Sequence, residues 1–462
     1  MEVETRGTRI LRGNPKRAII KLSLPMMLAM LVQTVYNLAD GVWVAGLGPK
    51  PLAAIGLFFP IFMVILSLAA GIGVGASSVV ARKIGQKDKP GADAAAMISL
   101  ILSLIIGVIS TVVSLFVVGP VLRLIGASGE TLQLCLEYAK VLLFSTTLMM
   151  FNNVANGILR GEGDAKRAMY AITIGSVLNI ILDPLFIYVF KLGVGGAAYA
   201  TVLSIAISSV LISYWLFFKK STYVSLKIRD FSYDSHILRD ILKIGIPASL
   251  AQISMSVAVF VLNVFAIRAG GDYGVAVFTS GWRVINFGTV PLIGIAMAVT
   301  SVTGAAYGER DGNKLDIAHL FAVKFGFFIG LFVMFAIAGL APYIALVFTY
   351  SDDGSALYGD LVVSLRIMSL FLPGVPFGMF TSSMFQGIGH GGKSLLVTVM
   401  RTIVMQLVFS WFFVFFLQTG LNGVWWGIVL GNATSAIITF SWGRAIVKEI
   451  KRSFHNEKKL TL

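Results

Sequence analysis

Long apolar stretches separated by short polar connections run along almost the whole chain of 462 residues. About 20 apolar residues are enough to cross a bilayer as a helix. Hydropathy, together with Gly and Pro as helix breakers, predicts twelve such helices. Their expected bounds are 17–43, 53–81, 92–118, 131–159, 168–190, 194–218, 240–267, 275–306, 317–340, 357–387, 394–418 and 421–446. The pattern predicts an all-α polytopic membrane protein.

The second half of the chain repeats the first. Lys21-Leu-Ser-Leu-Pro25 opens the first predicted helix, and Lys243-Ile-Gly-Ile-Pro247 opens the seventh. Six helices per half give both halves the same orientation, so a pseudo-twofold axis along the membrane normal should relate them. We expect three parts: an N-lobe of residues 1–218, a linker of residues 219–239 and a C-lobe of residues 240–462.

Composition and charge support membrane insertion. The chain is 57% hydrophobic and 13% charged, and its formal charge is +15. When basic residues near helix ends are counted with the adjoining connection, 28 of the 37 Lys and Arg fall on the side of both termini, four on the other side and five inside helices. The positive-inside rule therefore predicts a multi-pass cell-membrane protein with both termini in the cytoplasm. Membrane topology accounts for the basic charge without nucleic acid as a partner.

Acidic residues are rare inside the predicted helices. Of the 22 acids, only Asp40 and Asp183 lie deep in them, where an acid usually marks an ion path or a substrate site. Asn179 shares a helix face with Asp183, and Pro184 leaves a backbone carbonyl without its helical partner. The alternative is a Pro-kinked helix whose Asp is neutral and bonded to a neighbour.

Depth estimates bring further oxygens to the same level. Thr201 lies roughly 10 Å inside its helix, where it meets the expected depth of Asp183, and Asp40 belongs to the same half of the membrane. Carboxylates, an amide, a hydroxyl and backbone carbonyls near Ala197 suit Na⁺ or a shared proton. Thr201 bonded only to its own helix is the alternative.

The repeat does not include this acidic site. In register with Asp40, Asn179, Asp183 and Thr201, the second half has Leu262, Gln406, Ser410 and Ile428. A purely structural requirement would act on both halves, so the asymmetry favours a functional role for the acids.

Other polar residues extend this site. Tyr36 and Gln33 lie one and two turns before Asp40 on the same face. Asn156 belongs to a polar patch on the fourth helix and is expected on the wall of a cavity. Pro25 should bend the first helix, either for packing or for a conformational change.

These residues resemble those of the multidrug and toxic compound extrusion (MATE) family, and most closely its DinF-type branch with its archaeal members. The resemblance covers nearly the whole chain and rests on Asp40, Asn179-xxx-Asp183-Pro184 and Ala197-xxx-Thr201. It implies two lobes that export organic cations and drugs in exchange for Na⁺ or H⁺. It also implies an ion site at Asp40, Asn179, Asp183, Thr201 and the Ala197 carbonyl, and a drug cavity near Gln33, Tyr36, Tyr138 and Asn156.

We therefore expect a secondary-active multidrug antiporter that works as a monomer among membrane lipids, needs no cofactor besides its coupling ion and is not an enzyme. A flippase for a lipid or lipid-linked precursor is the alternative, although it would require a basic cleft. A membrane-embedded transferase would require an Asp-rich metal motif, and the sequence has none. The single cysteine, Cys135, rules out an internal disulfide.

Overall fold

The computed structural model describes residues 4–219, 221–226, 233–350 and 355–460, whose regular structure is entirely helical. Part of the predicted linker, residues 227–232, lies outside the described residues. A short helix, α1 (Arg6–Arg12), precedes the first membrane-length helix. The first half continues with α2 (Pro15–Ala45), α3 (Pro49–Gly85), α4 (Lys89–Leu124), α5 (Gly129–Phe144), α6 (Thr146–Gly161), α7 (Ala165–Pro184), the π-helix η1 (Leu185–Val189), α8 (Gly193–Ser213) and the π-helix η2 (Tyr214–Phe218).

The second half follows the same plan with different interruptions. Its elements are α9 (Ser235–Gly308), α10 (Gly312–Phe348), the 3₁₀ turn η4 (Ser355–Leu357), α11 (Tyr358–Ser369), the 3₁₀ turn η5 (Leu372–Gly374), α12 (Val375–Gly387), α13 (Gly391–Val399), the π-helix η6 (Met400–Met405), α14 (Gln406–Trp411), the π-helix η7 (Phe412–Phe416) and α15 (Leu421–Leu460).

The described helices account for twelve membrane crossings. Ten are long and apolar enough to cross a bilayer, and the bent pair α5–α6 makes an eleventh. The 74 residues of α9 would extend over roughly 110 Å, far more than the bilayer core. Its helical dihedrals break at Gly270 and Gly271, where φ reaches 60°. Because α9 thus contains two crossings, the predicted number of helices is confirmed.

Several helices extend beyond their predicted ends. The third predicted helix, 92–118, is α4 with bounds Lys89–Leu124, and the last continues to Leu460 instead of 446. The helices predicted at 240–267 and 275–306 both lie within α9, on either side of the break at Gly270 and Gly271. Hydropathy detects the apolar core of a crossing, whereas helical hydrogen bonding continues through the polar residues beyond it.

The repeat is also present in the backbone. Lys87 and Arg310, at equivalent turns, have φ of 60° and 53°. Lys191 and Gln418, at another pair of equivalent turns, have φ of 56° and 51°. Positive φ is uncommon for residues other than glycine. Its occurrence at equivalent turns, at residues that differ between the halves, shows that both halves have the same backbone conformation there.

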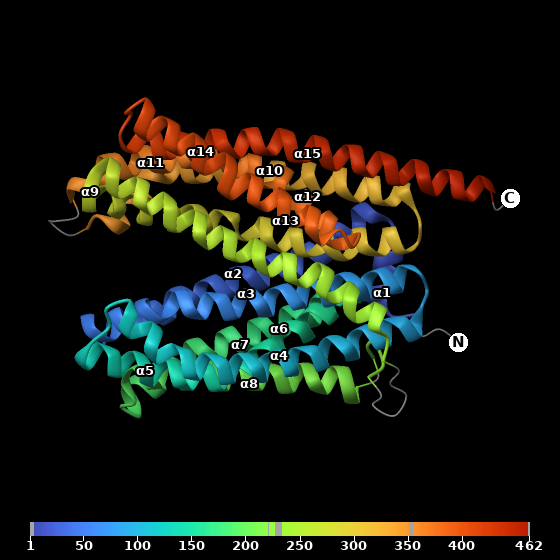
Figure 1. The fold of residues 1–462 in the computed structure, drawn as a ribbon, viewed down its shortest axis with the longest axis horizontal. Coiled ribbons are helices and arrows are strands. Elements are labelled where there is room, and N and C mark those ends of the chain that lie inside the picture. Colours follow the sequence, from blue (N-terminus) through green and yellow to red (C-terminus); the bar gives the residue numbers. More distant parts are fainter. Residues whose placement is uncertain (1–3, 220, 227–232, 351–354, 461–462) are drawn as a thin grey trace.

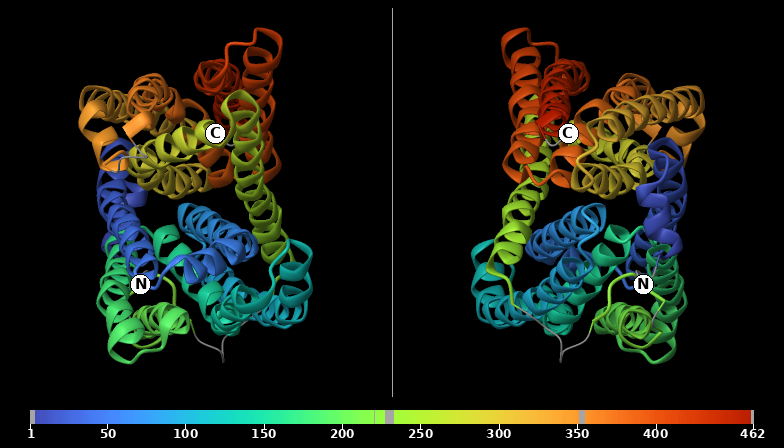
Figure 2. Two further views of the ribbon diagram at one scale, coloured as in Figure 1. Left: turned by 90° about the vertical axis from the view of Figure 1, so that its left-hand side faces the viewer. Right: turned by 90° about the vertical axis from the view of Figure 1, so that its right-hand side faces the viewer.

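The helices form two groups, coloured blue to green and yellow to red in Figure 1. Views along the bundle show α2 and the first part of α9 running between the groups on opposite sides (Figure 2). Both chain ends lie at the same end of the bundle, called the terminal end below (Figure 1). This arrangement is the predicted fold of two six-helix lobes.

Glycines allow the lobes to approach closely towards the terminal end. A Cβ on Gly245 of α9 would lie 3.2 Å from the carbonyl oxygen of Gly71 on α3. A Cβ on Gly75 would lie 2.6 Å from the carbonyl oxygen of Ile241. Larger side chains at these positions would push the lobes apart, so small residues set the spacing between α3 and α9.

Candidate functional site

Pro184 ends the α-helical part of α7 and shapes the backbone beside Asp183. Proline has no N–H to continue the helical bonding pattern, and the chain continues as the π-helix η1. The N–H of Phe190 donates to the carbonyl of Leu185 at 2.9 Å, five residues earlier. Asp183 itself is fully buried. The π-helical interruption that often accompanies functional sites therefore follows directly after the acid.

Asn179 connects Asp183 on α7 with Thr201 on α8. In the orientation that satisfies both neighbours, its Nδ2 donates to Asp183 Oδ2 at 2.9 Å and its Oδ1 accepts from the Thr201 hydroxyl at 3.1 Å. The reverse orientation, with Nδ2 towards the Thr201 Oγ1 at 3.1 Å, turns the amide oxygen towards the carboxylate. The first orientation is favoured because each donor then meets an acceptor.

The second acid comes from α2. The carboxyl groups of Asp40 and Asp183 lie close enough to interact with each other. The Oδ1 atom of Asp40 is buried without a partner. One turn earlier, the Tyr36 hydroxyl is within hydrogen-bonding distance of Thr201. We call Asp40, Asn179, Asp183 and Thr201 the carboxyl cluster.

Small residues bring α8 close to η1, which directly follows α7. A Cβ on Gly196 would lie 2.7 Å from the carbonyl oxygen of Phe186. Ala197, the next residue, is fully buried and lies one turn before Thr201. This close packing positions the Thr201 hydroxyl against α7. A contribution of the Ala197 carbonyl to an ion site stays a prediction.

Tyr138 closes the site from α5. Its ring is buried and packs edge-on against Phe58 of α3, with centroids 5.8 Å apart. It lies close enough to Asp40 and Asp183 to interact with them electrostatically. Of the four residues expected in the drug cavity, Tyr36 and Tyr138 are therefore next to the carboxyl cluster.

Gln33 and Asn156 lie at a different level, nearer the terminal end. Gln33 is exposed on α2, seven residues and roughly 10 Å from Asp40. Asn156 is buried on α6 and donates to Asn152 Oδ1 at 3.2 Å. Asn152 in turn donates to the Ser208 hydroxyl at 3.1 Å. The structure does not bring Gln33 or Asn156 into the carboxyl cluster; Asn156 belongs to a separate polar group between α6 and α8.

Pro25 lies inside α2, on the terminal side of Gln33. The helix continues through it from Pro15 to Ala45, and its ring is partly buried. The neighbouring Met27 packs against Gly294 of α9, where a Cβ would lie 2.6 Å from the Met27 nitrogen. A bend at Pro25 stays a prediction.

The equivalent positions of the second lobe are packed differently. Leu262 and Ile428 are fully buried apolar side chains where the first lobe has Asp40 and Thr201. Ser410 lies against Gly427, and its hydroxyl has no hydrogen-bond partner. The second lobe thus keeps the helical scaffold and replaces the polar cluster.

Sequence reasoning missed two interactions near these helices. The Tyr188 hydroxyl donates to the carbonyl of Trp43, which joins η1 to the end of α2. Asn152 joins α6 to α8 through Ser208. Both interactions link residues far apart in the chain, so local sequence spacing does not predict them. The run of asparagines on α6 was the only sign of a polar contact there.

Sequence reasoning also missed the role of Glu162 at the terminal end. Glu162 is buried between α6 and α7, and its Oε2 accepts from the backbone N–H groups of Tyr223 at 2.9 Å and Val224 at 3.2 Å. Burial raises the pKa of Glu162 to about 8, with the nearby Asp164 acting in the same direction. Its position between two glycines was visible in the sequence, but its burial was not.

Carboxyl and hydroxyl oxygens and the amide of Asn179 meet in the carboxyl cluster. Their oxygen atoms are hard donors that suit an alkali cation, and two neighbouring carboxyl groups suit a proton. The surrounding fold, with twelve crossings in two repeated lobes, is that of a polytopic membrane transporter.

Comparison with known proteins identifies the kind of transporter. Residues 25–185 and 247–412 match the MatE family, one segment in each half of the chain. The chain therefore belongs to the MATE family of multi-pass membrane transporters and is not an enzyme.

Individual relatives agree over nearly the full length. The multidrug export protein MepA of Staphylococcus aureus strain MRSA252 is 28% identical over 91% of this chain and 92% of its own. An outward-facing multidrug resistance MATE family transporter of the MOP superfamily is 56% identical, with a TM-score of 0.96 over 98% of this chain and 100% of its own. A MOP superfamily transporter from Pyrococcus furiosus, described as having a binding pocket of reverse polarity that suggests a different function, is 56% identical, with a TM-score of 0.95 over 97% and 100%.

Proposed function

We propose that this protein is a secondary-active multidrug efflux antiporter that exports organic cations in exchange for Na⁺ or H⁺. The observation that carries the proposal is the carboxyl cluster, in which two carboxyl groups, Asp40 and Asp183, lie next to each other in the first lobe, whereas the equivalent positions of the second lobe carry no acid. The MepA relatives, named as multidrug export proteins, support small-molecule drugs as substrates.

Coupling follows from competition for negative charge. A cationic drug near Asp40 and Asp183 is attracted by their charge, and this attraction is strong where water is scarce. Na⁺ or a proton bound between the same carboxyl groups removes most of that charge and weakens the attraction. By linkage, a bound drug weakens ion binding by the same factor. Entry of the ion therefore promotes drug release.

Alternating access between the lobes provides the transport step. Gly71, Gly75 and Gly245 bring α3 and α9 together towards the terminal end, so we assign the closed side of the molecule to that end. We place the terminal end in the cytoplasm of a cell-membrane protein, because it carries most of the Lys and Arg. In this orientation the ion reaches the carboxyl cluster from outside, and α2, α7 and α8 repack around it.

A flippase for a lipid-linked anionic precursor is the second candidate. Arg401 on η6 is buried in the second lobe, and its Nε has no hydrogen-bond partner. A buried cation within the membrane favours an anion nearby. The reverse polarity described for the Pyrococcus furiosus pocket points in the same direction. We prefer cation export because the converging polar groups of the first lobe are acidic.

Uptake into proteoliposomes tests the antiporter directly. Vesicles holding the purified protein receive a fluorescent organic cation under a Na⁺ gradient at equal pH, and separately under a pH gradient at equal Na⁺. We expect at least one gradient to drive accumulation well above that in protein-free vesicles, and the Asp183→Asn variant to lose this accumulation. If neither the Na⁺ gradient nor the pH gradient raises accumulation above the level without a gradient, coupled antiport is excluded.

A further inference from the structure

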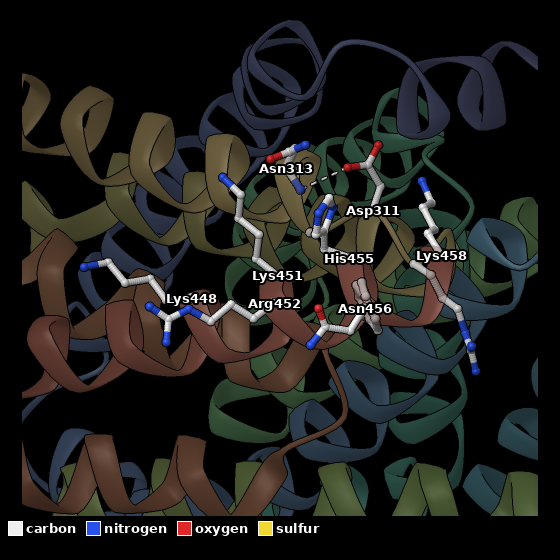
Figure 3. A pocket seen from close by; sticks show the side chains of 11 residues that line it. Asp311, Asn313, Lys448, Lys451, Arg452, His455, Asn456 and Lys458 are labelled. Carbon is white, nitrogen blue, oxygen red and sulfur yellow. Dashed lines mark hydrogen bonds between the residues drawn. The ribbon is translucent and has the colours of Figure 1, made fainter. Parts of the chain in front are cut away.

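The last turns of α15 and the turn between α9 and α10 form a second polar site, at the terminal end of the second lobe. It is a pocket of about 660 Å³, shown in Figure 3. Among the described residues that line it, Asp311 is the single acid. The Lys and Arg residues of the lining are Arg310, Lys448, Lys451, Arg452 and Lys458. With histidine neutral, five cations and one carboxylate leave four formal positive charges in the pocket.

The positive charge is gathered on one face of α15. Lys448, Arg452 and His455 follow each other at spacings of four and three residues, so they lie on the same side of the helix. At roughly 100° per residue, Glu449 points to another side, and Glu457 is engaged by Arg310 of the α9–α10 turn. A helix end needed only for solubility has no reason to separate its charges in this way. The separation points to a ligand with negative charge.

Two of the pocket cations already have acidic partners. Arg310 Nη1 lies 2.6 Å from Glu457 Oε2, and Lys451 Nζ lies 3.5 Å from Asp316 Oδ2. These pairs join the α9–α10 turn and α10 to α15. Their role is therefore to hold the pocket walls together.

Lys448 and Arg452 are available to a ligand. Lys448 and Arg452 form no hydrogen bond or ion pair with any other described residue. Asp311 is engaged as the N-cap of α10, where it accepts from the N–H groups of Asn313 at 3.0 Å and Lys314 at 2.9 Å. Figure 3 shows Asp311 near Asn313, while Lys448 and Arg452 extend along α15. The acid thus neutralises little of the charge that Lys448 and Arg452 present.

Close packing keeps the pocket in place. A Cβ on Gly312 at the start of α10 would lie 2.7 Å from the Lys451 Cα, so the two helices are in direct contact there. Phe454 packs against Tyr307 of α9, with ring centroids 5.5 Å apart. The basic face of α15 is therefore fixed against α9 and α10 and does not form a free helical tail.

The pocket lies just beyond the lipid headgroups, within reach of its long side chains. From Leu421 to Trp442 α15 rises about 32 Å, the thickness of the bilayer core, and an aromatic residue such as Trp442 is typical of that boundary. Lys448 lies six residues, or roughly 9 Å, further on. The headgroup layer is about 5–8 Å thick on each side, and the long side chains of Lys448 and Arg452 reach back into it.

We infer that this pocket binds a phosphate group, carried by the headgroup of an anionic phospholipid in the leaflet next to the terminal end. Lys448 and Arg452 supply the unpaired charge, and Arg452 adds the planar donors that match phosphate oxygens. A bound headgroup would bridge α15 and the α9–α10 turn, which are both in the second lobe. The site is separate from the carboxyl cluster and does not depend on which solute is transported.

Binding of short-chain lipids to the full-length protein in detergent tests this inference. The probes are dioctanoyl phosphatidylglycerol, which is anionic, and dioctanoyl phosphatidylcholine, which is zwitterionic. The variant is Lys448→Gln with Arg452→Gln. The matched control is Lys16→Gln with Arg17→Gln, which removes one Lys and one Arg from exposed positions at the same end of the molecule, on α2. Unfolding temperatures of all proteins show whether each is folded.

We expect the wild type and the control variant to bind phosphatidylglycerol at least tenfold more tightly than phosphatidylcholine. The pocket variant should lose roughly 30-fold in affinity for phosphatidylglycerol, because each cation near an anionic headgroup contributes about a factor of five. An unchanged affinity in the pocket variant, or an equal loss in the control, would overturn the inference. Both outcomes can be read even if coupled transport is absent.

A competition experiment separates a lipid from a soluble phosphate source. Glycerol 1-phosphate and inorganic phosphate are added at millimolar concentration as competitors. Little competition identifies the lipid as the ligand. Tight binding of glycerol 1-phosphate alone, lost in the pocket variant, keeps the phosphate site but overturns the lipid assignment.

Discussion

At the scale of single residues, Asp183 is held by groups from two helices, α7 and α2. A carboxylate inside the membrane is costly unless its oxygens are paired. Asn179 supplies an N–H from the same helix at 2.9 Å, and Asp40 supplies a second carboxyl group from α2. In the second lobe Ser410 occupies the equivalent place without a hydrogen-bond partner. The shared backbone does not require the acid, which is why we assign it a functional role.

The Asp183→Asn variant tests this role. We expect it to abolish coupled drug export while the protein still folds, because the amide keeps the size of the carboxylate and can bond to Asn179. Ser410→Ala is the matched control in the second lobe and should leave transport within a few-fold of wild type. Export assays in cells together with unfolding temperatures of the purified proteins give both readouts. If Asp183→Asn exports as well as wild type, or if Ser410→Ala loses as much activity, the assignment is wrong.

The contacts of the carboxyl cluster show how far local spacing predicts a site. The four-residue spacing of Asn179 and Asp183 and the matching depth of Thr201 could be read from the sequence, because helix geometry fixes both. The contact between Tyr188 and Trp43 could not, since it depends on how η1 packs against α2. The orientation of the Asn179 amide likewise depends on neighbours from another helix.

At the scale of helices, glycines determine how closely neighbours pack. Gly157 of α6 lies directly against Gly73 of α3, so that a Cβ on Gly157 would overlap the Gly73 carbonyl. Gly339 of α10 has open space around its α-carbon. Both are helix-interior glycines, and only the structure distinguishes them.

The Gly157→Ala variant should therefore destabilise the protein by about 1–3 kcal/mol, because α3 and α6 must move apart. Gly339→Ala should be neutral or stabilising by up to about 1 kcal/mol, since alanine favours the helix and meets no neighbour. Thermal unfolding in detergent compares the two. Equal unfolding temperatures for both variants would contradict the packing argument.

Glu162, directly after α6, bonds to the segment that follows η2, within the predicted linker. It accepts two backbone N–H groups from Tyr223 and Val224, and burial raises its pKa to about 8 from an ordinary value of 4.5. A carboxyl group with a raised pKa in the folded state stabilises the fold in its protonated form. This stabilisation is complete below about pH 4.5 and is lost as the pH rises through about 8.

The Glu162→Gln variant keeps an oxygen for both backbone N–H groups and does not titrate. We expect the wild type to lose stability relative to this variant between pH 5 and 8, by at most about 1.4 kcal/mol per pH unit. Unfolding temperatures measured across pH 5–9 provide the comparison. A difference between the two proteins that is constant over this range would show that Glu162 does not titrate as described.

The helices also show which features hydropathy can predict: the number and order of the crossings, but not where each helix ends or where it becomes π-helical. Their number and order were predicted correctly because apolar length determines a membrane crossing. The polar extension of α15 to Leu460 was not, because its helical hydrogen bonds continue outside the apolar core. The π-helical turns were not predicted either: η1 follows Pro184, but η7 contains no proline.

At the scale of the whole molecule, specific contacts near the terminal end hold the two lobes together. Arg82 Nη2 of α3 lies 3.1 Å from Asp240 Oδ2 of α9. The Ser78 hydroxyl donates to the carbonyl of Gln386 on α12 at 2.6 Å. Together with the glycine contacts, these bonds must break if the terminal end is to open. The internal repeat predicted two lobes, but it gave no information on which end they close.

The central claim is that drug and coupling ion compete for the carboxyl cluster. Equilibrium binding of a fluorescent organic cation to the purified protein, across pH 5–9 and with or without Na⁺, tests it most directly. We predict tight binding at high pH without Na⁺, weaker binding when Na⁺ is added or the pH is lowered, and binding in Asp183→Asn that depends little on either. Binding by the wild type that is unaffected by pH and Na⁺, or that becomes tighter on acidification, would contradict the proposed antiport.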